Sequence, residues 1–166
     1  MANFTFNWLT FPKEESRTNE VIEMFKELAE KNTVSPMFGQ LPTWMGDRFD
    51  GYFFDVAVEE NDGVLVTYRS KYEPNRETIV EIGKHYGVSL DLDYDESASG
   101  LYGRLSFDAE SGTFVDHYLD ENDLKLFSLD EESGMTLFEG ELWNSGEEVK
   151  EALLLRKIQP YEAGRG

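Results

Sequence analysis

Residues 67–108 read TYRSKYEPNRETIVEIGKHYGVSLDLDYDESASGLYGRLSFD, and the order of patterns in this stretch decides the fold. After a first apolar run, apolar residues recur with helical spacing between Asn75, which suits a helix N-cap, and Gly87, which suits a helix end. The alternation Leu-Asp-Leu-Asp-Tyr-Asp at 90–95 predicts a strand with one buried and one solvent-facing row, and residues 101–107 repeat that alternation. The stretch therefore predicts a helix followed by two strands.

The residues before this stretch complete a larger unit. Residues 4–10 alternate in hydropathy as in a strand, and residues 16–31 carry an apolar stripe with helical spacing. Two further alternating runs, 52–59 and 64–69, are joined by Asn-Asp-Gly, a sequence that favours a tight hairpin turn. The order is β-α-β-β-α-β, so we predict an α+β fold with a ferredoxin-like split βαβ antiparallel sheet. One added strand, at 101–107, extends this sheet.

The residues after Asp108 carry weaker patterns. Short strands are predicted at 113–119, 124–129 and 135–143, and an amphipathic helix at 146–158. We therefore divide the chain into a ferredoxin-like α+β domain, residues 1–108, and C-terminal strands and a helix, residues 109–166. The second part is expected to pack as an extension of the same domain.

Charge and cysteine content limit the classes of function. The chain has 34 acidic and 15 basic residues, a net charge of -19, and no cysteine. Such a charge repels nucleic acid and anionic membranes and attracts basic proteins or cations. The absence of cysteine excludes disulfides, thiolate metal sites and cysteine nucleophiles. We see neither a signal peptide nor an apolar run long enough for a membrane span, so we expect a cytoplasmic protein.

Motifs for catalysis and cofactor binding are absent from the sequence. It has no G-x-S-x-G, no phosphate-binding glycine loop and no paired histidines at metal-ligand spacing. The run D-x-D-x-D at 91–95 fails as a calcium loop, because Glu96 occupies the sixth position, which requires glycine, and Tyr102 the twelfth, which requires glutamate. We therefore expect no catalytic residue, cofactor or metal. A hydrolase with paired carboxylates stays open, because 34 acidic residues permit many arrangements.

Two groups of residues are candidates for binding a partner. The segment from Asn32 to Gly51 is long for a connection and contains Phe38, Trp44 and Phe49. The alternate positions Asp91, Asp93 and Asp95 share one face of a strand, and Arg104 on the next strand is a suitable cross-strand partner for the second of them.

Part of the chain resembles a known family. The features that carry the resemblance are the NWLTF run at 7–11 together with Thr67, Tyr72, Pro74, Ile79 to Tyr86, Tyr94, Glu96 and Gly103. In these features the chain is similar to the YubB-type ferredoxin-like family of phage- and plasmid-borne domains of unknown function. The resemblance implies a ferredoxin-like fold and a mobile-element origin, and it carries over no catalytic residue. No counterpart is predicted for the residues beyond Asp108.

The leading hypothesis is a non-enzymatic accessory protein that binds another protein through the sheet face or through the segment 32–51. The charge favours a basic partner, and we expect no direct binding to nucleic acid or membranes. The alternative is an acidic DNA mimic that occupies the nucleic-acid groove of a restriction, defence or other DNA-binding protein. Its phosphate-like carboxylates are the three aspartates at 91–95 together with Asp120, Glu121, Asp123, Asp130, Glu131 and Glu132.

Overall fold

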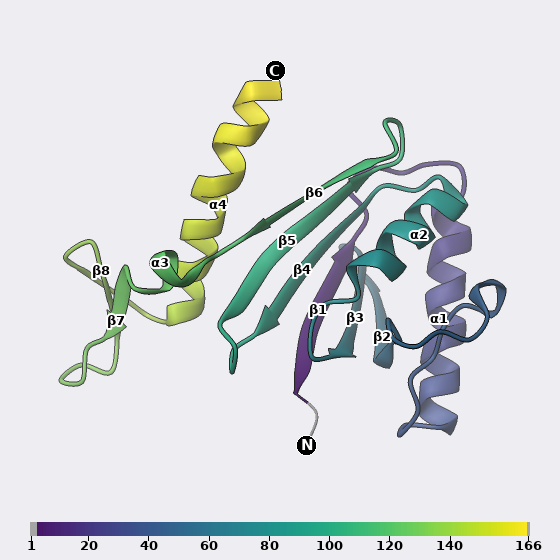
Figure 1. Ribbon diagram of the computed structural model, residues 1–166, viewed down its shortest axis with the longest axis horizontal. Helices are drawn as coiled ribbons and strands as arrows, with labels where there is room; N and C mark the ends of the chain where they lie inside the picture. Colours follow the sequence, from purple (N-terminus) through teal and green to yellow (C-terminus); the bar gives the residue numbers. More distant parts are fainter. Residues whose placement is uncertain (1–2, 166) are drawn as a thin grey trace.

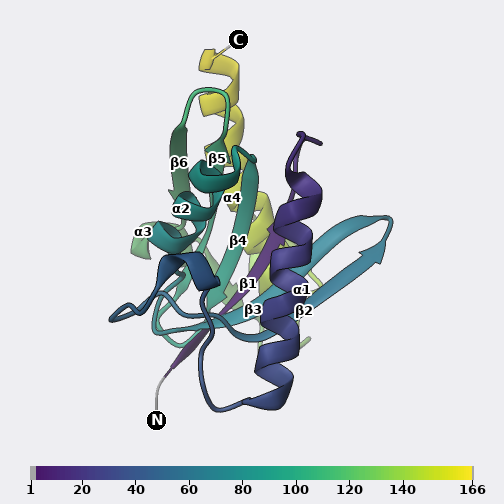
Figure 2. The same ribbon diagram turned by 90° about the vertical axis from the view of Figure 1, so that its right-hand side faces the viewer.

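The computed structural model describes residues 3–165, with the side chains of residues 3–160. Six strands in this range form one antiparallel sheet in the order β2-β3-β1-β4-β5-β6. Their bounds are β1 Phe4–Thr10, β2 Phe54–Asn61, β3 Gly63–Lys71, β4 Leu90–Glu96, β5 Leu101–Asp108 and β6 Thr113–Tyr118. Helices α1, Thr18–Val34, and α2, Arg76–Tyr86, cover one face of the sheet (Figures 1 and 2). The predicted ferredoxin-like α+β fold is confirmed.

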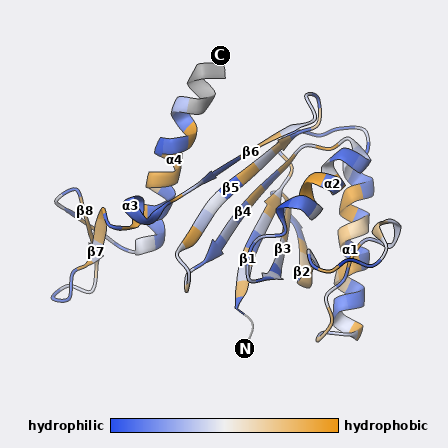
Figure 3. Ribbon diagram, viewed as in Figure 1, coloured by the Kyte–Doolittle hydropathy of each residue, from blue (hydrophilic) through white to orange (hydrophobic). Residues whose placement is uncertain are grey.

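The buried rows of β1 to β5 face the two helices. Leu90, Leu92 and Tyr94 of β4 are fully buried against α1 and α2, as the alternation predicts. Hydrophobic and hydrophilic residues alternate along the strands of the sheet (Figure 3). In β1 the smaller and more polar row, which includes Asn7, points to the helices, while Phe6 and Trp8 lie on the opposite face. Among its inward polar groups, Asn7 Nδ2 donates to Ser70 Oγ at 2.9 Å and to the Thr5 carbonyl at 3.1 Å, whereas Asn7 Oδ1 is buried without a hydrogen-bond partner among the described residues.

The start of β2 is irregular because of a bulge. Asp55 has a positive φ of 51°, and its backbone N–H donates to Asn32 Oδ1 of α1 at 2.8 Å. The extra residue lets Phe53 and Val56, which are three positions apart, both enter the core. The predicted simple alternation at 52–59 is therefore broken at this point.

The ends of α2 differ in how well the sequence predicts them. Gly87 has a left-handed φ of 65°, which confirms it as the residue that ends the helix. Asn75 precedes the helix, but its side chain does not cap it. Instead Tyr68 Oη donates to Asn75 Oδ1 at 2.5 Å, and Asn75 Nδ2 donates to the Gly51 carbonyl at 3.1 Å. The predicted cap is wrong because a tertiary partner holds the amide.

The C-terminal part contributes one strand to the sheet and then forms a smaller layer. Strand β6 pairs with β5, so the ferredoxin-like sheet is extended by two strands rather than the one predicted. The rest comprises α3 Glu121–Leu124, a three-stranded sheet of β7 Phe127–Leu129, β8 Thr136–Phe138 and β9 Glu141–Trp143, and α4 Gly146–Arg165. The predicted strand at 124–129 is thus the end of α3 followed by β7, and 135–143 is a hairpin.

A second apolar cluster holds this layer together. Phe138 of β8 and Val149, Leu153 and Leu154 of α4 form its buried centre. Helix α4 lies on the face of the large sheet opposite to α1 and α2, where Glu151 contacts Tyr102 and Arg104 of β5. Among residues 3–165, no helix combines the length and the apolar composition needed to cross a membrane.

Candidate functional site

Trp44 is fixed in a short 3₁₀ turn, Thr43–Met45, between α1 and β2. Its ring stacks on His85 of α2 with centroids 3.8 Å apart and an interplanar angle of 6°. Its Nε1 donates to Tyr86 Oη at 3.1 Å. These contacts hold the indole in one position while leaving 37% of the residue exposed. A rigid, partly exposed aromatic ring is well suited to contact a partner.

Phe38 and Phe49, the other two aromatic candidates of this segment, are strongly exposed. Neither lines the same hollow as Trp44. Arg48 anchors the segment through a bidentate pair with Glu81 of α2, at 2.8 and 2.7 Å. Of the three predicted aromatic residues, Trp44 therefore lines this hollow, and Phe38 and Phe49 do not.

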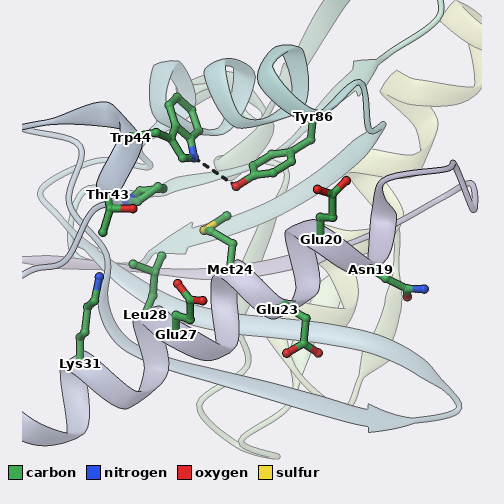
Figure 4. Close-up of a pocket in the computed structure, with 11 residues that line it drawn as sticks. Asn19, Glu20, Glu23, Met24, Glu27, Leu28, Lys31, Thr43, Trp44 and Tyr86 are labelled. Atoms are coloured by element: carbon green, nitrogen blue, oxygen red, sulfur yellow. Dashed lines mark hydrogen bonds between the residues drawn. The ribbon is translucent and has the colours of Figure 1, made fainter.

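That hollow, which we call the α1 groove, lies between α1 and the 3₁₀ turn and has a volume of about 410 Å³. Figure 4 shows Trp44 and Tyr86 on one side and Met24 with the glutamates of α1 on the other. Met24 and Leu28 form an apolar floor, since both are buried in the core. The lining is Asn19, Glu20, Glu23, Met24, Glu27, Leu28, Lys31, Pro42, Thr43, Trp44 and Tyr86.

The rim of the α1 groove is acidic because α1 places glutamates three and four residues apart on one face. Glu20 pairs with Arg17 at 2.6 Å, and the hydrogen bond from Arg17 lowers the pKa of the Glu20 carboxyl. Glu23 pairs with Lys26 at 3.0 Å. Glu27 makes no ion pair or hydrogen bond with any residue whose side chain the structure describes. It therefore offers a free negative charge beside an apolar floor.

The three predicted aspartates lie on the opposite face of the sheet. Asp93 accepts hydrogen bonds from Arg104 Nε at 2.5 Å and Nη2 at 3.2 Å, which confirms the expected cross-strand pair. Arg104 Nη2 also reaches Glu151 of α4 at 3.5 Å. Asp91 and Asp95 take part in no ion pair among the described residues. The aspartate row thus contains one paired and two unpaired carboxylates.

A second hollow, which we call the outer pocket, lies between this face and α4. Its volume is about 270 Å³, and its lining is Trp8, Asp93, Tyr94, Asp95, Tyr102, Gly103, Glu147, Glu151 and Leu154. Burial raises the pKa of the Asp95 carboxyl, and the nearby charge of Lys150 opposes that effect. Asp95 Oδ1 is shielded from solvent and has no hydrogen-bond partner in the described part of the chain. Asp91 does not line the pocket.

A polar network that the sequence did not suggest links α2 to β4 and β6. Tyr94 Oη donates to Asp116 Oδ1 at 2.7 Å, and Arg76 Nη2 donates to Tyr94 Oη at 3.3 Å. Arg76 Nε lies 2.7 Å from Asp116 Oδ2. Burial and the bond to Asp116 raise the pKa of Tyr94 well above its usual range. The available signal was the tyrosine on one strand and Gly103 directly opposite on the next, an arrangement that makes room for a large ring.

The other hollows and clusters carry less chemistry. A hollow of about 490 Å³ lies beside Arg76, whose charge the network already uses. Glu96, part of the resemblance motif, accepts from the backbone N–H groups of Ala98 and Ser99 and closes the turn between β4 and β5. Across the described residues, no group of three or more histidines and carboxylates is placed to hold a metal ion.

Comparison with protein families matches residues 51–139 to the ferredoxin-like domain in Api92-like protein. The match covers more than half of the chain, from the start of β2 to the end of β8. It extends past Asp108, where we predicted no counterpart, so the residues up to 139 belong to the matched region. No curated protein and no solved structure matches the chain.

Proposed function

Since the chain belongs to the family of the ferredoxin-like domain in Api92-like proteins, we propose that it is a non-enzymatic accessory protein that binds another protein. We further propose that it is of the YubB type, is encoded by a phage, plasmid or integrated element, and acts in the cytoplasm. The observation that carries the proposal is the α1 groove. It combines a fixed aromatic wall, an apolar floor and an acidic rim.

The shape of the α1 groove favours a protein segment as its occupant. The lining residues of α1 run from Asn19 to Lys31, which corresponds to about 18 Å of helix. An amphipathic segment of a partner could place apolar side chains on Met24 and against Trp44, as in helix-in-groove recognition. Basic side chains on its flank would then meet Glu20 and Glu27, and the net charge of -19 supports a basic partner over an acidic one.

We expect Trp44→Ala and Glu27→Gln each to weaken partner binding by about tenfold, because one removes the aromatic wall and the other the unpaired charge. Glu30→Gln is the matched control, since Glu30 is an exposed glutamate of α1 outside the groove. The measurement compares recovery of the partner that co-purifies from the native host on the wild type and on each variant. Circular dichroism checks that the fold is retained. Equal recovery on the wild type and both groove variants would contradict the proposal.

The second candidate function is the acidic DNA mimic. It is favoured by Glu121, Glu131 and Glu132, which are exposed and form no ion pair with any described residue. Against it, Asp93 is bound to Arg104 and Asp123 to Lys157, so part of the proposed phosphate-like set is already neutralised.

Salt dependence separates the two candidates. For a mimic, affinity for a basic DNA-binding protein should fall steeply between about 50 and 300 mM salt, because the partner's phosphate-binding surface is engaged through many charges at once. Isothermal titration at several salt concentrations measures this. An affinity that does not change over this range of salt concentrations rules out the mimic. A shallow decline in affinity for the wild type, together with loss of binding in Trp44→Ala, favours groove binding.

A further inference from the structure

We propose that the outer pocket is a second binding site, on the sheet face opposite to the α1 groove, and that it takes an arginine side chain from a protein partner. This inference is independent of what the α1 groove binds. It rests on the rows of side chains that cross β1, β4 and β5, on the unpartnered oxygen of Asp95, and on a side-chain arrangement that recurs elsewhere in this molecule.

Two neighbouring rows cross the three strands on this face. In the first row, Trp8 is opposite Asp93, and Asp93 is opposite Arg104, so an aromatic ring, a carboxylate and a guanidinium lie side by side. The carboxylate of this row has its cation.

In the second row, Asp95 lies between Phe6 of β1 and Tyr102 of β5. Here the carboxylate has an aromatic residue on both sides and no cation. Trp8, diagonal to Asp95, lies within about 7–8 Å by antiparallel strand geometry. The second row therefore has the anion and the aromatic rings of a cation site, with the cation itself missing.

The same combination occurs with a cation present at four other places among the described residues. In each, an arginine lies over an aromatic ring, 4.5 to 5.2 Å from its centroid, and pairs with a carboxylate. The four sets are Arg17 with Tyr86 and Glu20, Arg69 with Phe4 and Asp55, Arg76 with Tyr94 and Asp116, and Arg156 with Phe138 and Glu139. A guanidinium stacks on an aromatic face and donates in a planar fork to a carboxylate, which is why arginine suits this arrangement.

The charged groups around the pocket leave Asp95 without a cation in contact. Arg104 is bound to Asp93 and Glu151. Lys150 lies over the Tyr102 ring, with Nζ 5.6 Å from the centroid, and forms no ion pair with Asp95. Glu147, on the first turn of α4, adds a second negative charge that raises the pKa of Asp95. An incoming guanidinium would satisfy Asp95 Oδ1, whose burial without a partner is otherwise costly.

The test uses blocked arginine, N-acetyl-arginine N-methylamide, which carries the side chain without a free carboxylate. Binding is followed by the ¹H–¹⁵N indole signal of Trp8. Trp44 and Trp143 serve as internal references, because neither lines the outer pocket. We expect the Trp8 signal to shift and saturate while the two reference signals stay fixed. Blocked citrulline, the neutral isostere, should leave Trp8 unshifted.

Variants of the aspartate row locate the binding. Asp95→Asn should weaken the affinity for blocked arginine by about tenfold, the loss expected for one charge-assisted hydrogen bond. Asp91→Asn is the matched control, because it removes the same charge from the same face of β4 at a position outside the pocket. It should change the affinity by less than about twofold. Glu147→Gln, at an exposed position, should also weaken the binding of blocked arginine. This variant replaces Asp95→Asn in the test if Asp95→Asn misfolds. An unmoved Trp8 signal, equal shifts with citrulline, or equal losses for Asp95→Asn and Asp91→Asn would overturn the inference.

Discussion

Gly103→Ala is expected to destabilise the protein by about 3 kcal/mol, because the added methyl group has no space to occupy. A Cβ at this position would lie 2.4 Å from Tyr94 Oη and 2.5 Å from the backbone carbonyl oxygen of His117. The second atom belongs to the paired strand β6, so relief requires β5 and β6 to separate or the Tyr94 ring to leave the core. For a chain of this length the melting temperature should fall by roughly 6–12 °C.

Gly146→Ala is the matched control for this substitution. A Cβ on Gly146 would meet its nearest neighbours at 3.9 Å, which is ordinary contact distance. We expect the melting temperature of this variant to lie within about 2 °C of the wild type. Thermal and urea unfolding of the two variants, recorded side by side, measure the difference. A Gly103→Ala variant as stable as Gly146→Ala would show that Tyr94 and β6 accommodate the methyl group freely.

The second large effect is expected for Asp116→Ala, at about 2–3 kcal/mol. The substitution leaves the half-buried Arg76 guanidinium with only the exposed Glu73 carboxylate, 3.6 Å away, and removes the acceptor of Tyr94 Oη. We place the cost below that of a fully buried pair because both side chains retain some solvent contact, 26% and 18%. In a double-mutant cycle with Arg76→Met, the combined loss should be smaller than the sum by about 1–2 kcal/mol. Strict additivity would mean that the two side chains do not interact.

The same network predicts how stability changes at alkaline pH. The folded-state pKa of Tyr94 is raised above the unfolded value of about 10, so the unfolded chain loses this proton first as the pH rises. Stability contributed by the neutral phenol is therefore present below about pH 10 and is lost as the pH rises above that value. Tyr94→Phe should reduce the decline between pH 10 and 11, measured by urea unfolding. The decline should not vanish, since the pKa values of Tyr68 and Tyr102 are raised as well.

The sequence predicts the fold best where consecutive residues follow one clear pattern of apolar and polar side chains. Leu90, Leu92 and Tyr94 alternate with aspartates, and Gly87 can adopt the left-handed backbone conformation that ends a helix. Which row of β1 side chains points to the helices was not predictable in this way, because both rows contain apolar residues. It is decided by partners distant in sequence, such as Ser70, which binds the inward Asn7.

The extension beyond β5 was harder to predict for a related reason. Strand β6 lies at the edge of the sheet, and Phe114 and Tyr118 are about half exposed, so its pattern lacks the contrast of a buried strand. Asn75 shows the opposite difficulty. It has the right residue type and position for a cap, but Tyr68 offers its amide a buried tertiary partner.

The candidate sites depend on contacts between distant segments. Trp44 was selected for its residue type and segment, yet the α1 groove exists because the 3₁₀ turn lies against Tyr86 of α2 and the glutamates of α1. The pair of Asp93 and Arg104 follows from alternation on adjacent strands, and the structure confirms it. The outer pocket needs α4 as well, and no local pattern places Glu147 near Asp95.

The central position of β1 has a consequence for how the chain folds during synthesis. This strand lies between β3 and β4, yet the ribosome makes those two neighbours about 55 and 80 residues after β1. At roughly 5–20 residues per second, β1 waits on the order of 4–16 s before both of its edges can be paired. The centre of the sheet can therefore form only after the residues up to the end of β4 have been synthesised. Such dependence on long-range strand pairing favours slow folding.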